Sequence, residues 1–164
     1  MGNGRCYNCK NCGNSYMTML GIGFLYSKQY KKTINDIISG KYGKRRQELF
    51  NNTPLATVNA EQALFVCESC GAWKQDVDLT LYAPNNPKKL LKSKSLKKAV
   101  EEQGYVLFVI GWELKENYHI IMEHYCFCPK CKKRMKKSSQ DDTKVLKCPI
   151  CGTDNDPLDS FCWD

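Results

Sequence analysis

The chain has 164 residues, enough for one ordinary domain or two small ones and too few for a large multidomain enzyme. With 42% hydrophobic and 26% charged residues, it is not a wholly disordered chain. The formal net charge is +8, and the eleven cysteines cannot all pair with one another. Because no signal-peptide pattern or long apolar run is present, we expect a cytoplasmic protein with reduced thiols and no membrane partner.

The first predicted element is a Cys-x-x-Cys unit at Cys9 and Cys12, one of four in the chain. Two thiolates two residues apart can hold one tetrahedral ion from a single turn, and a glycine after the unit accepts the positive φ of that turn. Glycine follows three of the four units. Since two units complete one site, the sequence predicts two four-cysteine metal sites. Their ligands are Cys9, Cys12, Cys67, Cys70, Cys128, Cys131, Cys148 and Cys151.

We expect the first two units to share a site, although 54 residues separate Cys12 from Cys67. Their sequences, CKNCG and CESCG, resemble the two halves of a rubredoxin-type site. A helical insert at about residues 27–52 explains the gap, because apolar residues recur there with the spacing of one buried helix face before a capping glycine. These residues are Tyr30, Ile34, Ile37, Ile38 and Gly40, and a second short helix is predicted over 44–50.

After the second unit, alternating apolar residues predict a half-exposed strand over 77–82. A basic connector follows, with a short helix whose apolar side is formed by Leu96, Ala99 and Val100 and which Gly104 closes. The apolar segments 105–112 and 118–127 predict two further strands, separated by a polar turn at 115–117.

The third and fourth units are separated by 16 residues, a spacing typical of a four-cysteine zinc site. Between them, short strands over 134–137 and 143–147 are predicted, joined by a polar turn at 138–142. Residues 126–152 resemble the zinc-ribbon superfamily, whose metal-binding turns often read Cys-Pro-x-Cys, as Cys128–Cys131 and Cys148–Cys151 do. This resemblance implies a structural module and no particular activity.

The predicted fold is therefore α+β, with two small zinc-ribbon modules joined by a connector helix and strands. The expected boundaries are 1–83 for the expanded ribbon with its helical insert, 84–117 for the connector, and 118–164 for the C-terminal ribbon with an acidic tail. Two zinc ions are expected, although Cys-x-x-Cys spacing does not select between zinc and rubredoxin-like iron.

Three cysteines and both histidines fall outside this pattern. Cys6 and Cys162 are interpreted as spare thiols, and Cys126 either as another or as a ligand that exchanges with Cys128. His119 and His124 are interpreted as ordinary strand residues.

Positive charge is concentrated at two places, before or on the connector helix and beside the third Cys-x-x-Cys unit. Such clusters can follow a phosphate backbone. Two filled thiolate sites would lower the formal charge to about +4, so some lysines are also explained as charge balance. The residues predicted to bind nucleic acid are Lys88, Lys89, Lys92, Lys130, Lys132, Lys133, Arg134, Lys136 and Lys137, with Tyr125, Phe127, Phe161 and Trp163 as candidate stacking residues.

No nucleophile motif, carboxylate pair or phosphate loop stands out in the sequence. We therefore predict a non-enzymatic zinc-finger protein whose metal sites present a basic surface to nucleic acid. The alternative is a zinc-ribbon adaptor that binds a protein partner, and the third hypothesis is a rubredoxin-like electron carrier.

Overall fold

The computed structural model describes residues 2–23, 26–106, 109, 111–138 and 144–163. Over these residues the protein is mixed α/β, with five helices and several small antiparallel sheets. No helix in the described ranges is long and apolar enough to cross a membrane.

The chain divides into two compact units, each built from separate stretches of sequence. The cysteine-rich unit comprises residues 1–25, 61–77 and 125–164, and the inserted unit comprises 26–60 and 78–124. The chain therefore alternates between the units, in contrast to the three consecutive segments 1–83, 84–117 and 118–164 expected from the sequence.

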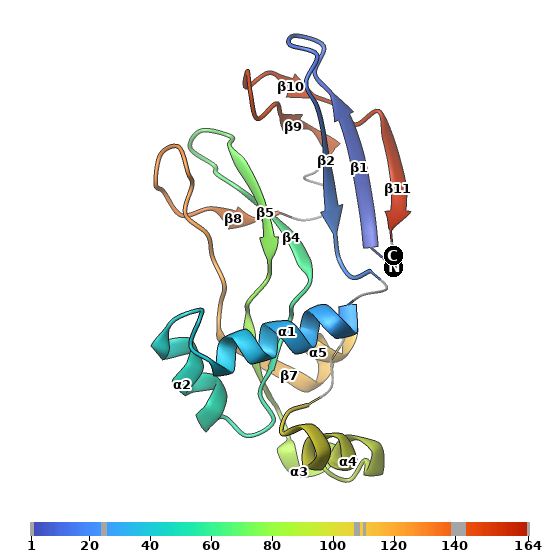
Figure 1. Cartoon of the computed structure of the whole chain (residues 1–164), viewed down its shortest axis with the longest axis vertical. Helices are drawn as coiled ribbons and strands as arrows, with labels where there is room; N and C mark the ends of the chain where they lie inside the picture. Colours follow the sequence, from blue (N-terminus) through green and yellow to red (C-terminus); the bar gives the residue numbers. More distant parts are fainter. Residues whose placement is uncertain (1, 24–25, 107–108, 110, 139–143, 164) are drawn as a thin grey trace. The chain divides into compact units, whose positions relative to one another are not determined.

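Three antiparallel sheets make up the secondary structure described in the cysteine-rich unit. Their strand orders are β11-β1-β2, β5-β4-β8 and β10-β9 (Figure 1). The strands are β1 (Gly2–Asn8), β2 (Ser15–Leu20), β4 (Gln62–Val66), β5 (Trp73–Val77), β8 (Lys136–Lys137), β9 (Leu146–Lys147), β10 (Asp154–Asn155) and β11 (Asp159–Trp163).

The strand β4 is buried on both faces, which explains its continuous apolar sequence. Leu64 is fully buried and packs in a cluster with Tyr7, Leu20 and Leu146. Its neighbour Phe65 belongs to a second cluster, which contains Cys67 and Cys128. Because side chains alternate along a strand, one short segment serves two cores.

The C-terminal segment, expected to be an acidic tail, forms β11 and pairs with β1. Its aromatic rings lie over glycines of β1: a Cβ atom on Gly4 would come within 2.3 Å of the Phe161 ring, and one on Gly2 equally close to Trp163. The Trp163 indole also donates a hydrogen bond to the Leu20 carbonyl (3.2 Å). Phe161 and Trp163 are therefore packing residues of this sheet.

The inserted unit contains a sheet of order β3-β6-β7 and the five helices. The predicted helices are confirmed as α1, α2 and α4, and Gly104 caps α4 in the left-handed conformation. The bounds are β3 (Thr57–Val58), β6 (Leu81–Pro84), β7 (Tyr118–Met122), α1 (Tyr26–Ile38), α2 (Lys44–Asn52), α3 (Pro87–Leu90), α4 (Lys94–Gln103) and α5 (Gly111–Asn117).

Several strand predictions are wrong. In the segment 105–112, the described residues 105, 106 and 109 are outside strands and α5 begins at Gly111; residues 107, 108 and 110 lie outside the described part of the chain. The polar turn predicted at 115–117 is the end of that helix. The strand predicted over 118–127 ends at Met122, and that over 77–82 is divided between β5 and β6. Short apolar runs do not by themselves separate a strand from a buried helix.

The face of α1 predicted from its periodicity is buried except for Ile38, which is 41% exposed. Ile34 and Ile37 are completely buried, and Tyr30 is 2% exposed. The Tyr30 hydroxyl lies 2.7 Å from Thr57 Oγ1 and donates to the Val106 carbonyl (2.9 Å). Burial raises the pKa of this phenol well above its usual range, so it stays neutral.

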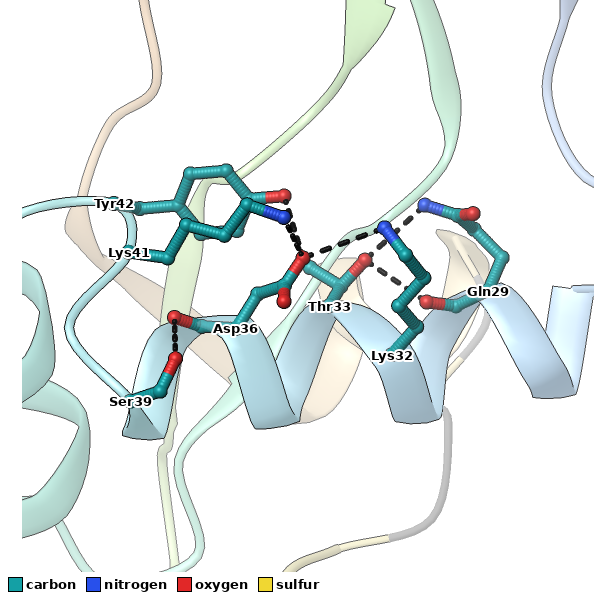
Figure 2. A network of polar contacts seen from close by, with 7 residues as sticks. All are labelled: Gln29, Lys32, Thr33, Asp36, Ser39, Lys41 and Tyr42. Carbon is teal, nitrogen blue, oxygen red and sulfur yellow. Dashed lines mark hydrogen bonds and ion pairs between the residues drawn. The ribbon is translucent and has the colours of Figure 1, made fainter.

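At its C-terminal end, α1 is closed by Gly40, which has a left-handed φ of 80°. The Gly40 amide donates to the Ile37 carbonyl and the Lys41 amide to the Asp36 carbonyl, a Schellman arrangement. The Asp36 carboxylate accepts hydrogen bonds from the side chains of Lys41 (2.8 Å), Lys32 (3.4 Å) and Tyr42 (3.4 Å), as Figure 2 shows. The hydrogen bond from Lys41 lowers the pKa of Asp36 below its ordinary value.

Asp36→Asn should therefore lower the denaturation midpoint at neutral pH by a small amount. A carboxylate whose pKa is lowered in the folded state contributes stability above the unfolded-state pKa, about 3.9, and this contribution is lost as the pH falls through the folded-state value. Thermal melts of both proteins from pH 7 downward should converge in acid. Glu48→Gln, which removes only an exposed pair with Lys44, should melt like wild type; a constant difference for Asp36→Asn at every pH would contradict this assignment.

Candidate metal centres

The eight predicted ligands gather into two groups of four sulfur atoms, each within 4.8 Å of one another. The outer site contains Cys9, Cys12, Cys148 and Cys151, and the inner site contains Cys67, Cys70, Cys128 and Cys131. Sulfurs of different Cys-x-x-Cys units are 3.4 Å and 3.6 Å apart in the outer site and 3.4 Å and 3.5 Å apart in the inner site. A tetrahedral ion with metal–sulfur bonds of about 2.3 Å separates its sulfurs by about 3.8 Å, whereas a disulfide bond is about 2.05 Å long. The geometry fits two four-thiolate metal sites.

The pairing predicted from the sequence is wrong. The first unit joins the fourth, and the second joins the third. The reason lies in the sheets: β8 pairs with β4, which leads into Cys67, whereas β9 pairs with β10. The strands expected to form one hairpin after Cys131 thus belong to different sheets, and the turn predicted at 138–142 lies mostly outside the described residues.

All four units have the same local fold. In each, the amide of the first cysteine donates to the carbonyl five residues later, and the amide four residues later donates back to the cysteine carbonyl. The first bonds are Cys9–Asn14 (2.9 Å), Cys67–Ala72 (2.8 Å), Cys128–Lys133 (2.8 Å) and Cys148–Thr153 (2.8 Å); the return bonds start from Gly13 (2.8 Å), Gly71 (2.8 Å), Lys132 (3.0 Å) and Gly152 (2.9 Å). We call each such turn a knuckle and number the knuckles in chain order.

The residue after each Cys-x-x-Cys unit has a left-handed backbone. Gly13, Gly71 and Gly152 have φ values of 71°, 69° and 78°, and Lys132 in the third knuckle has 63°. A residue with a side chain is strained in this conformation, by about 1 to 2 kcal/mol. The third knuckle keeps the common turn at this cost, and the exposed Lys132 ammonium donates to the Pro129 carbonyl (3.1 Å).

Hydrogen bonds to the sulfurs favour thiolates. The amides of Cys131 and Lys130 lower the pKa of Cys128 to about 6. In the outer site, the Thr153 hydroxyl lowers the pKa of Cys151 to about 5. At Cys70 the Ala72 amide also acts to lower the pKa, but the Cys128 sulfur, partial desolvation and the other two sulfurs of the site outweigh it and raise the pKa to about 11. Four crowded thiolates repel one another, so full deprotonation requires a cation at the centre.

The two sites differ in their surroundings. The inner site is embedded in an apolar cluster with Ala63, Phe65 and Met135, and Cys70 is its one exposed ligand. The outer site exposes both Cys12 and Cys151. Because four protein sulfurs fill a tetrahedral ion, neither site keeps a position for substrate.

Aromatic side chains hold β9 next to the outer site. Tyr16 stacks on Tyr7 with ring centroids 4.9 Å apart, and its hydroxyl donates to the Leu146 carbonyl (3.1 Å). The Trp73 indole donates to the Lys147 carbonyl (2.7 Å). These side chains fix the strand that leads directly into Cys148, a role that the sequence analysis missed because no local pattern marks it.

The remaining cysteines and histidines lie outside both four-cysteine groups. Cys126 is 7% exposed within the apolar cluster of the inner site, without being one of its four ligands. Cys6 lies on β1 and Cys162 on β11, where the register places Cys162 opposite Asn3. His119 lies on β7, and its ring contacts the Asn85 side chain (3.0 Å).

The predicted basic residues are divided between the two units. Lys88, Lys89 and Lys92 belong to the inserted unit, on or just after α3. The others lie on the third knuckle and β8 of the cysteine-rich unit; they are Lys130, Lys132, Lys133, Arg134, Lys136 and Lys137, all exposed. Lys136 pairs with Glu68 at 3.6 Å, an exposed ion pair of little energetic weight.

Comparison with protein-family models, curated proteins and solved structures found no significant match.

The pairing can be tested by metal content, with two ions per chain expected for wild type. Cys12→Ser with Cys151→Ser removes two ligands from the outer site, so one ion should be lost and one retained. Cys12→Ser with Cys70→Ser removes one ligand from each site, so a chelator should extract both ions more readily. Elemental analysis during a chelator titration distinguishes these results, and Cys6→Ser with Cys162→Ser serves as the control with two retained ions. If instead Cys12→Ser with Cys70→Ser loses one ion and retains the other, the pairing predicted from the sequence would be correct.

Lys132→Gly should stabilise the metal-loaded protein by about 1 kcal/mol, because it removes a side chain from a left-handed residue. The matched control is Gly152→Ala in the fourth knuckle, where an added Cβ meets no atom within 4 Å, so that only backbone strain is introduced. It should destabilise the protein by a similar amount. Denaturant unfolding at fixed metal concentration measures both, and a destabilised Lys132→Gly protein would show that the lysine side chain outweighs the strain.

Proposed function

We propose that the protein is a non-enzymatic, zinc-ribbon-like protein in which two four-cysteine zinc sites hold a basic surface for nucleic acid. The observation that carries the metal assignment is the convergence of four identical knuckles on two closed groups of four sulfurs. Closed sites of this kind are structural, because no coordination position is left for chemistry.

Zinc is the ion we assign, since structural zinc supplies about 10 to 16 kcal/mol of apparent binding free energy that is coupled to folding. The core of the cysteine-rich unit is divided into small clusters, so this contribution is large relative to its apolar burial. Rubredoxin-like iron would colour the protein and favour the electron-carrier alternative. A colourless protein with two zinc ions would exclude that alternative.

The basic surface is the third knuckle with β8. Between residues 125 and 138 the sequence has six cationic residues and no acidic one. These six positive charges exceed the charge of −2 that one filled four-thiolate site would carry. Balancing the inner site therefore does not account for all of them. The cluster at Lys88, Lys89 and Lys92 of the inserted unit is a second candidate for contact with phosphates.

The adaptor hypothesis remains the second candidate. It is favoured by the exposed Tyr125, Phe127 and Arg134, since tyrosine and arginine often dominate protein interfaces. A protein partner would not require the steep salt dependence expected of phosphate contacts.

The test is binding of the metal-loaded protein to short DNA and RNA, single- and double-stranded, over a salt series. Replacing Lys132, Lys133, Arg134, Lys136 and Lys137 by glutamine should weaken binding at least about tenfold at low salt and flatten the salt dependence, because phosphate contacts release counterions. Metal content should remain at two ions. The same replacement of Lys88, Lys89 and Lys92 measures the second cluster. Unchanged affinity after the five replacements in the third knuckle and β8 would refute the assigned surface. If wild type binds no nucleic acid even at low salt, the adaptor hypothesis would become the favoured function.

A further inference from the structure

Two large aromatic rings are exposed at the start of the third knuckle. Phe127 is 61% exposed and Tyr125 is 45% exposed. Their neighbours Cys126 and Cys128 are buried at 7% and 0%. Burial therefore alternates along this segment, with the two cysteines inward and both rings outward.

The rings are held in a defined arrangement. The Tyr125 and Phe127 rings meet edge to face, with centroids 5.6 Å apart. The Arg134 guanidinium lies 4.3 Å from the Tyr125 centroid, a cation–π contact. Backbone contacts fix the scaffold beneath them: Phe127 pairs with Arg134 in an antiparallel bridge, and the Met135 amide donates to the Cys126 carbonyl (2.8 Å).

The inner metal site makes this arrangement rigid. Cys128 and Cys131 are ligands within the same turn, so the ion fixes the backbone that carries Phe127. Side chains that are already ordered lose little conformational entropy when a ligand binds. Exposed aromatic rings that the fold itself does not bury are the kind of surface that marks a binding site.

The charge around the rings selects the chemistry of the ligand. Lys130, Lys132 and Lys133 are exposed in the same turn as Phe127. A ligand that matches flat apolar rings and several cations must carry both planar groups and repeated negative charge. A nucleic-acid strand with unpaired bases meets both requirements, because bases stack on aromatic faces while phosphates lie along the cations.

We infer that Tyr125, Phe127 and Arg134 form a stacking platform for unpaired bases, so that the preferred ligand is single-stranded nucleic acid. The inference rests on the nucleic-acid function proposed above and specifies its ligand class. In a duplex the bases are already stacked, and only phosphate contacts remain available to this surface. The other two aromatic candidates do not contribute, because Phe161 and Trp163 cover the glycines of β1.

The test compares Phe127→Ala with wild type on a short oligouridine and on a blunt-ended two-stranded RNA duplex at one salt concentration. Loss of one stacked base should weaken single-strand binding roughly five- to 150-fold and leave duplex binding unchanged. Arg134→Lys keeps the charge but loses the planar group, so it should also weaken the single-strand complex more than the duplex complex. Trp112→Ala, which removes a ring 59% exposed on α5, is the matched control and should bind like wild type.

Each other result overturns a specific statement, provided that metal content shows the variants to be folded. If Phe127→Ala reduces neither complex while wild type binds both, the platform is refuted and the basic surface stands. An equal loss of affinity for oligouridine and for the duplex would also refute base stacking, since the Phe127 ring would then support the structure of the binding surface without contacting bases. If wild type binds no nucleic acid at low salt, the proposed function itself fails, and the exposed rings belong to a protein interface.

Discussion

The cysteine-rich unit depends on the convergence of its four knuckles into two groups of four sulfurs, each of which can hold a metal ion as a cross-link. The inner site joins Cys67 to Cys131, and the outer site joins Cys9 to Cys151, so one cross-link encloses the other along the chain. An ion bound at each site would close a long loop, and the entropy cost of closing a loop rises only slowly with its length. Two such metal sites can therefore hold together distant segments of the chain. The small apolar clusters alone would hold these segments together only weakly.

This nesting explains how a second unit can be accommodated. Both segments of the inserted unit, 26–60 and 78–124, lie between knuckles: one between the first and second, the other between the second and third. With ions bound, the cysteine-rich unit could close across long intervening loops at a small additional entropy cost. The inserted unit has its own core, centred on Tyr30 and Ile34 of α1 and on a cluster around Val106 and Leu114.

The same cross-links give the proposed function its physical basis. A closed site contributes rigidity without reactivity, and the third knuckle is where that rigidity meets exposed aromatic and cationic side chains. Lys132 combines a cost in backbone strain with a gain in positive charge at the proposed surface. It occupies a left-handed position where the other three knuckles have glycine, so one turn bears backbone strain and carries an additional positive charge.

The sequence by itself determined the ligand residues and the helices α1, α2 and α4, because knuckles and amphipathic faces are local patterns. It did not determine which knuckles share an ion, since the four turns are alike and any two can complete a tetrahedron. That choice was made by contacts between distant segments: β8 on β4 brings Cys128 to Cys67, while the hydrogen bonds of Tyr16 and Trp73 to β9 place Cys148 beside Cys9. Pairing between distant strands, like the covering of Gly2 and Gly4 by β11, depends on contacts that no short segment encodes, so only the tertiary structure decided it.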